Sequence, residues 1–184
     1  MKHRLLCTLG TIVLGMVAFG ASPAGAASAA GLYYATPSWD LKLDASTRFI
    51  VLTNWGSAAV LDRETGLVWE QSPSTSAFTW GNGQAAFHCN NLSVGDRLGW
   101  RLPTIQELAS LVDGDPHNTS RPRLPPGHPF SNVQSSFYWS ASTNASFTGH
   151  AWGVDFGDGG VLNGYRTSNF FVWCVRGGQG VNPQ

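Results

Sequence analysis

Charged side chains are scarce in this sequence, and neither sign of charge predominates. Only 12% of the 184 residues are Asp, Glu, Lys or Arg, with 11 basic and 11 acidic side chains. Strong affinity for nucleic acid needs a basic excess that neutralises several phosphates. The composition therefore excludes a general nucleic-acid-binding protein and leaves only a local patch for any polyanion.

Long apolar runs are also missing, except near the start. Residues 5–19 are apolar, a short basic segment at 2–4 precedes them, and small residues suited to cleavage occupy 24–29. This order is typical of a secretory signal, and a run of about 15 residues is shorter than the roughly 20 that span a bilayer. We predict a signal peptide at residues 1–29, and no membrane-spanning segment after its cleavage.

Removal of the signal leaves about 155 residues, the size of one domain. Lys2 and Arg4 leave with it, so the net charge falls to about −2. We expect the mature protein to be secreted, periplasmic or on the cell surface. Within it we assign a linker or arm to residues 30–46, a domain to 47–178 and a tail to 179–184.

Cysteine is rare as well, with three in the chain. Cys7 lies in the signal, so Cys89 and Cys174 remain. An isolated pair in an oxidising compartment is most simply a disulfide. Two buried thiols, or a reactive or metal-binding pair, are the alternatives, although zinc sites cluster three or four ligands at short spacing.

The pattern of apolar residues predicts an α+β domain. Strands are expected at 49–52, 58–62 and 67–70, and later at 137–142, 151–156, 161–165 and 170–176, with a hairpin turn at 157–160. Two helices are expected between these groups, at 79–92 and 104–112. Thr104 and Glu107 fit a capping box at the start of the second helix.

Several strings occur in an order that resembles a known bacterial family. They are DRETGLVW (62–69), Cys89, WRLPTIQEL (100–108), YWS (138–140), AWGVDF (151–156) and CVR (174–176). The chain resembles the C-terminal domain of the collagen-like adhesin Lcl over roughly residues 47–177. The resemblance implies a C-type-lectin-like α+β fold, with two helices packed on short antiparallel strands.

The resemblance also implies a function. In the adhesin, this domain follows a collagen stalk and is associated with attachment and with binding sulfated polysaccharides. This chain has no Gly-X-Y stalk, so a collagen-driven trimer and its avidity do not carry over. We expect a non-catalytic domain that binds a polysaccharide, sulfated ones included, or a cell-surface protein. The alternative is a structural or assembly module of the cell envelope.

The best local candidate for binding is the proline-rich loop between residues 115 and 129. It carries His117, Arg121, Arg123 and His128, and arginine can hold a sulfate or carboxylate through two parallel bonds. An ordinary solvated loop is the simpler alternative. The arginine of the WRLPT string is instead expected to be structural, as a partner of Glu107 or of backbone carbonyls. Arg176, which follows Cys174, is expected to be structural as well.

Other chemistry has weaker support. Asp155 and Asp158 flank a glycine turn and could bind calcium, but turn formation explains both. Ser140, His128, His150 and Asp155 are residue types used in catalysis, yet their spacing does not group them. We therefore predict no catalytic residue, no metal site and no cofactor.

Tryptophan is plentiful, with eight in the chain. Those within predicted strands and helices should be buried, whereas Trp39 and Trp55 should be exposed. The residues expected in the core are Trp69, Trp80, Trp139, Trp152 and Trp173.

Overall fold

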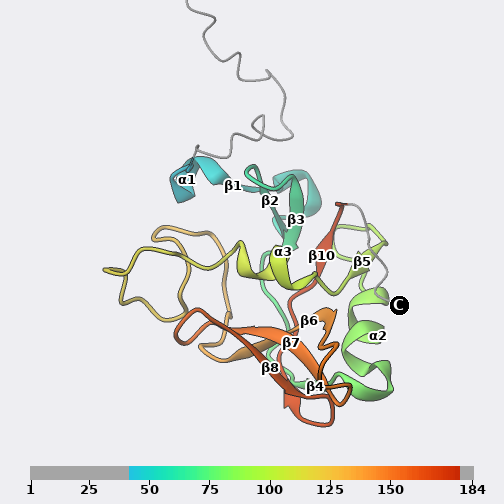
Figure 1. Cartoon of the computed structure of the whole chain (residues 1–184). Helices are drawn as coiled ribbons and strands as arrows, with labels where there is room; N and C mark the ends of the chain where they lie inside the picture. The colour runs from blue at the N-terminus through green and yellow to red at the C-terminus, as the bar shows by residue number, and fades with distance from the viewer. Residues whose placement is uncertain (1–41, 179–184) are drawn as a thin grey trace, which may run out of the picture.

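A computed structural model describes residues 42–178 of the chain (Figure 1). The predicted signal peptide, most of the arm, the tail, Cys7 and Trp39 lie outside these residues. No helix in the described part is long and apolar enough to cross a membrane. The fold is α+β with mostly antiparallel strands, as the sequence predicts.

A five-stranded antiparallel sheet occupies one end of the molecule. Its order is β1 (Phe49–Val51), β2 (Ala59–Asp62), β3 (Leu67–Glu70), β10 (Val175–Arg176) and β5 (Trp100–Arg101). The first three strands were predicted from their apolar runs, whereas β5 was not. The last strand of the described residues thus lies between an early strand and a middle one, which closes the domain.

The second sheet has three strands, in the order β6 (Phe137–Thr143), β7 (His150–Asp155) and β8 (Gly160–Tyr165). The predicted turn joins β7 to β8, with Asp155 opposite Gly160. A small ribbon pairs β4 (Phe78–Thr79) with β9 (Asn169–Phe170).

The strand predicted at 170–176 is divided in the structure. Its start belongs to β9 and its end to β10, in different sheets. Val172, Trp173 and Cys174 between them are all fully buried. A strand with one solvated face would alternate in burial, so this segment instead passes through the core between the sheets.

The helices are shorter than predicted. The α2 helix (Gln84–Asn90) follows a 3-10 turn, η2 (Gly81–Gly83), in which Asn82 has a φ of 57°. The predicted start at residue 79 is therefore wrong, because glycine and a left-handed residue interrupt the first turn. Helix α3 (Ile105–Ala109) has the expected capping box between Thr104 and Glu107. Two short elements were not predicted: α1 (Ala45–Arg48) and η1 (Thr53–Trp55).

Tryptophans form the centre of the core. Trp173 contacts the rings of Trp69 and Phe130 at centroid distances of 5.8 and 4.8 Å. Trp69, Trp139 and Trp173 are fully buried, as predicted. The prediction is wrong for the other two, since Trp80 and Trp152 are only half-buried.

The predicted disulfide joins Cys89 of α2 to Cys174 beside β10. Both residues are completely buried, in a cluster that includes Trp100 and Trp139. The bond therefore fixes α2 to the segment that crosses the core.

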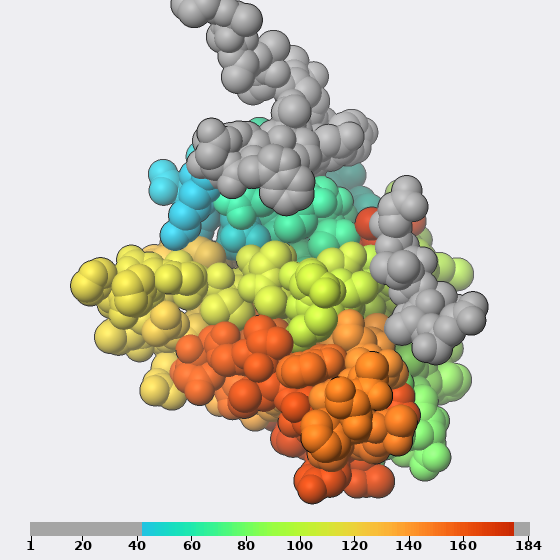
Figure 2. Space-filling model, viewed as in Figure 1, coloured from blue at the N-terminus to red at the C-terminus, as the bar shows by residue number. Residues whose placement is uncertain are grey.

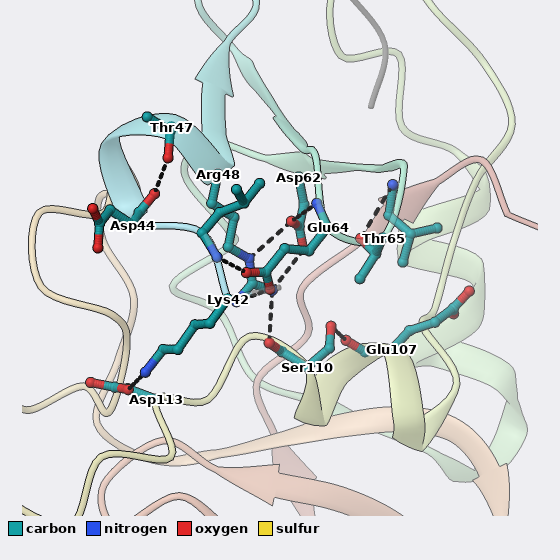
Figure 3. A network of polar contacts seen from close by, with 12 residues as sticks. Lys42, Asp44, Thr47, Arg48, Asp62, Glu64, Thr65, Glu107, Ser110 and Asp113 are labelled. Carbon is teal, nitrogen blue, oxygen red and sulfur yellow. Dashed lines mark hydrogen bonds and ion pairs between the residues drawn. The ribbon is translucent and has the colours of Figure 1, made fainter. Parts of the chain in front are cut away.

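Charged residues gather at one corner, which we call the charged corner: Lys42, Arg48, Asp62, Glu64 and Asp113 (Figure 3). Buried Arg48 donates two bonds to Asp62, of 2.9 and 2.8 Å, and pairs with Glu64 at 2.9 Å. Lys42 pairs with Asp113 at 3.5 Å. The end of the predicted arm therefore docks onto the domain.

Candidate functional site

A row of side chains crosses the outer face of the five-stranded sheet. The register places Ile50 opposite Leu61, Leu61 opposite Val68, and Val68 opposite Arg176. Directly opposed residues point to the same face of a sheet. The row is therefore apolar on β1 to β3 and carries a guanidinium on β10, with Trp100 of β5 opposite it.

These four side chains line a hollow of about 500 Å³. The remaining lining residues come from the end of β1 and the turn after it: Val51, Leu52, Thr53, Asn54 and Trp55. Small-ligand sites commonly have volumes of roughly 300 to 1,000 Å³. The hollow is therefore large enough for a small ligand or for a few units of a polymer.

Trp55 lies near two arginines, of which Arg176 lines the hollow with it and Arg97 lies outside the lining. Its ring centroid lies 5.5 Å from the guanidinium carbon of Arg97 and 5.7 Å from that of Arg176. Both distances are within the range of a cation–π contact. The site therefore combines an aromatic ring, two sets of N–H donors and an apolar wall.

The loop at residues 92–99 holds this arrangement in place. Gly95 has a φ of 61°, and a Cβ at this position would lie 2.6 Å from the Cβ of Trp55. Only glycine permits so close an approach. Arg176 Nε also donates a 2.8 Å bond to the carbonyl of Leu98. The indole and the second guanidinium are thus positioned by the same loop.

Among the described residues, neither Arg97 nor Arg176 has a carboxylate partner. Within residues 42–178, acidic side chains pair with three other basic ones, Lys42, Arg48 and Arg101. Asp96 precedes Arg97 in the chain but forms no ion pair with it. Two guanidiniums without acidic partners, beside an apolar wall, suit a ligand with anionic groups, because each can bind a sulfate or carboxylate through parallel N–H bonds.

The predicted loop residues do not form one cluster. The loop stands out at one side of the molecule, coloured yellow in Figure 2. His117 and Arg121 are exposed, whereas Arg123 and His128 are half-buried. In the described part of the chain, no hydrogen bond joins any two of the four.

Two of the four residues make contacts within the fold. Arg123 Nη2 donates a 3.0 Å bond to the carbonyl of Asp115. The His128 ring stacks on Phe130 at 5.9 Å, and burial lowers its pKa, so this imidazole is mainly neutral at pH 7. That this loop binds a ligand remains a prediction. Of its two arginines, Arg121 is the exposed one.

A second hollow, of about 580 Å³, is lined by Phe78, Gln84, Phe87, His88, Asn91 and Leu92. Phe87 is 70% exposed. Burial lowers the pKa of His88, so this surface offers apolar contact and no cation at pH 7. It suits an anionic ligand less well than the Trp55 hollow.

The two aspartates considered as calcium ligands accept hydrogen bonds from backbone N–H groups of their own turn. Asp155 accepts a 2.7 Å bond from the backbone of Gly157, and Asp158 a 2.8 Å bond from that of Gly160. Across residues 42–178, no group of three or more His, Cys, Asp or Glu side chains could hold a metal ion. Turn chemistry accounts for both carboxylates.

The residue types used in catalysis lie in separate environments. Ser140 is buried, and its hydroxyl donates a 2.7 Å bond to the carbonyl of Trp152. The His150 ring packs on Tyr165 at 4.2 Å. A nucleophile and its base must lie within hydrogen-bond reach, and this serine hydroxyl instead bonds to a carbonyl.

Comparison with known families assigns the chain. A model of the Lcl C-terminal domain matches residues 58–176, most of the described structure. The chain belongs to this family. The resemblance noted in the sequence is thereby confirmed, and the Lcl C-terminal domain is not a known catalytic family. A search among curated proteins finds no match.

In this Lcl C-terminal domain, the matched region contains Arg97 and ends at Arg176, while Trp55 precedes it. Trp55 was predicted to be exposed but is half-buried. Arg97 was not considered, and Arg176 was assigned a structural role. Their proximity comes from side-chain contacts between segments far apart in the chain, a signal that local sequence patterns lack.

Proposed function

We propose that this Lcl C-terminal domain is a non-catalytic binding module of C-type-lectin-like fold that works outside the cytoplasm. Its ligand is an acidic polysaccharide, sulfated ones included. Trp55, Arg97 and Arg176 form the centre of the site, and the apolar row on the sheet forms its wall.

One observation carries this proposal: the Trp55 ring lies 5.5 and 5.7 Å from two guanidiniums that have no acidic partner in the described part of the chain, beside a hollow of about 500 Å³. Aromatic faces bury the apolar faces of ligands. Guanidiniums bind sulfate or carboxylate groups bidentately. A sugar with anionic substituents presents both kinds of surface.

Family membership and the disulfide support the location. The family model covers 58–176, and Cys89 is bonded to Cys174. Disulfides persist mainly in oxidising compartments such as the periplasm and the cell exterior. This agrees with the signal peptide predicted at residues 1–29.

Glycan binding can be measured on the protein recovered after export from its host. Neutral, carboxylated and sulfated glycans are compared at two salt concentrations, for the native chain and for the variants Trp55→Ala and Arg97→Gln. We expect salt-sensitive binding of the acidic glycans that weakens about tenfold or more in each variant, since a hydrogen bond to a charged group contributes about 1.5 to 3 kcal/mol.

Arg121→Gln is the matched control, because it removes an exposed guanidinium from the proline-rich loop. It should leave binding unchanged. Loss of binding in Arg121→Gln, with Arg97→Gln unaffected, would move the site to the loop that carries His117, Arg123 and His128. If no glycan binds, the proposed glycan-binding function is wrong, and a structural module with a protein partner becomes the better interpretation.

A further inference from the structure

Another arginine stacks on a tryptophan just before the start of α2. The guanidinium carbon of Arg166 lies 3.9 Å from the ring centroid of Trp80, closer than either arginine at Trp55. Within residues 42–178, Arg166 has no acidic partner, and its buried Nε atom has no hydrogen-bond partner. Stacking on the indole therefore holds this guanidinium, and no carboxylate in that range neutralises its charge.

Backbone contacts fix these two residues, which we call the Trp80 pair. The N–H of Gly81 donates a 2.7 Å bond to the carbonyl of Arg166, and Trp80 Nε1 donates a 2.8 Å bond to the carbonyl of Ser140. Both side chains remain half-buried. An aromatic ring and a guanidinium without a carboxylate thus lie together here, the same combination as at Trp55.

Helix α2 connects the Trp80 pair to the Trp55 hollow. Trp80 immediately precedes η2, and the loop at 92–99, which positions Trp55, follows α2. The helix lies along one side of the molecule (Figure 1), and it contacts β4 and β5, which precede and follow it in the chain. At a rise of 1.5 Å per residue, the segment from Gly81 to Asn90 is about 15 Å long. The two aromatic sites therefore lie too far apart for one sugar ring, but one polymer chain can reach both.

The second hollow lies along one face of this helix. Gln84 accepts a 2.9 Å bond from the hydroxyl of Thr79, the residue before Trp80. At the other end of the hollow, Leu92 begins the loop that holds Trp55. The hollow therefore extends from beside one aromatic site towards the other. Its lining residues on α2 follow the helical spacing of three and four positions: Gln84, Phe87, His88 and Asn91.

The charges along this face suit a chain that carries anionic groups at intervals. No Asp, Glu, Lys or Arg occurs between Trp80 and Gly95, so no carboxylate on this stretch repels a polyanion. Phe87 is 70% exposed and offers apolar surface to the C–H faces of sugar rings. A purely apolar partner would leave the guanidiniums at both ends without an anion. An acidic polysaccharide matches the ends and the middle alike.

We propose that this face of α2 is a track for one acidic polysaccharide chain and that the Trp80 pair is a second anionic subsite, which rests on the proposed function and adds a minimum length for its ligand. A chain that fills both subsites must extend past α2. Once one subsite is occupied, binding at the other becomes intramolecular. A long chain therefore binds more tightly than a short one of the same chemistry.

Chain length provides the test. Size-fractionated oligosaccharides of dextran sulfate and of polygalacturonate, from the disaccharide to the polymer, are titrated by calorimetry against the exported native chain and against Arg166→Gln and Phe87→Ala. In the native chain, affinity should rise with length. Both variants should bind the polymers about tenfold more weakly, because one loses a charged hydrogen-bond donor and the other a large apolar contact. Disaccharide binding at the Trp55 hollow should not change.

Arg63→Gln is the matched control, because it removes a guanidinium from the turn after β2, away from the track. It should leave the binding of both lengths unchanged. Since Phe87 is exposed, its replacement keeps the fold even if Arg166→Gln does not. Disaccharides bound as tightly as polymers, or polymers that bind either variant like the native chain, would overturn the track and leave the proposed function standing. If no member of either series binds the native chain, the proposed function is overturned, and the track with it.

Discussion

The charged corner and the second sheet are held together by different interactions: ion pairs at the corner, and indole hydrogen bonds with apolar packing around the sheet. Both connect segments that are distant in the sequence. At the charged corner, Arg48 links the start of the domain to Asp62, and one of its guanidinium nitrogens donates a 2.8 Å bond to the carbonyl of Ser110. In contrast, residues 137–154 contain no Asp, Glu, Lys or Arg.

Around the neutral strands, indoles make the directional contacts. Trp139 Nε1 donates a 2.9 Å bond to the carbonyl of Phe78, and Trp80 Nε1 a 2.8 Å bond to that of Ser140. Each indole buries a large apolar area and supplies one hydrogen bond. A protein with few charged residues can thus keep specific long-range contacts, but it depends on apolar packing and on the disulfide.

The largest expected effect is at the charged corner. Arg48→Leu leaves the carboxylate of Asp62, which is fully buried, without its partner. Breaking one side of a buried ion pair typically costs about 3 to 5 kcal/mol. Urea unfolding should show a loss of this size. Arg63→Leu is the control, since this arginine has no acidic partner within the described residues, and it should cost much less; equal losses would contradict the role of the pair.

A smaller effect is expected from the cross-link of the neutral region. The double variant Cys89→Ala/Cys174→Ala opens a loop with a sequence separation of 85 residues. Disulfides typically contribute about 2 to 4 kcal/mol, mainly by restricting the unfolded chain. Urea unfolding of the double variant and of the native protein after chemical reduction should show similar losses. No loss in either would mean that aromatic packing alone fixes α2.

The same contrast separates what the sequence could predict from what it could not. The capping box of Thr104 and Glu107 and the β7–β8 hairpin are local, so a few adjacent residues specify them. Strand β5 has two residues and exists only because β10 pairs with it. The Trp55 hollow is equally non-local, because Arg97 and Arg176 reach Trp55 from distant segments.

Trp80 and Trp152 illustrate the same limit. Strand or helix periodicity indicates which side of an element a residue faces, but not whether another element covers that side. Both residues lie in or beside predicted elements, and both remain half-buried. Burial depends on the packing of the two sheets and the ribbon, which the local pattern does not encode.

The smallest of these effects concerns Glu70, an acidic group beside the neutral core. Burial raises its pKa to about 7, against a bond from the backbone of Cys174 that lowers it. Between pH 4.5 and about 7 the Glu70 carboxyl group is therefore protonated in the folded state but ionised in the unfolded state. Stability from this group is present at low pH and is lost as pH rises through that window.

Glu70→Gln removes this titration, because an amide stays neutral. The variant should match the native protein near pH 4 and exceed its free energy of unfolding by about 2 to 3 kcal/mol at pH 8.

Glu107→Gln should behave in the opposite way. Burial raises the pKa of Glu107, but the bonds from Arg101 and Thr104 prevail and lower it, so this variant should lose stability at neutral pH and less in acid. Parallel pH profiles for the two variants would refute the assignment of a neutral Glu70 to the folded state.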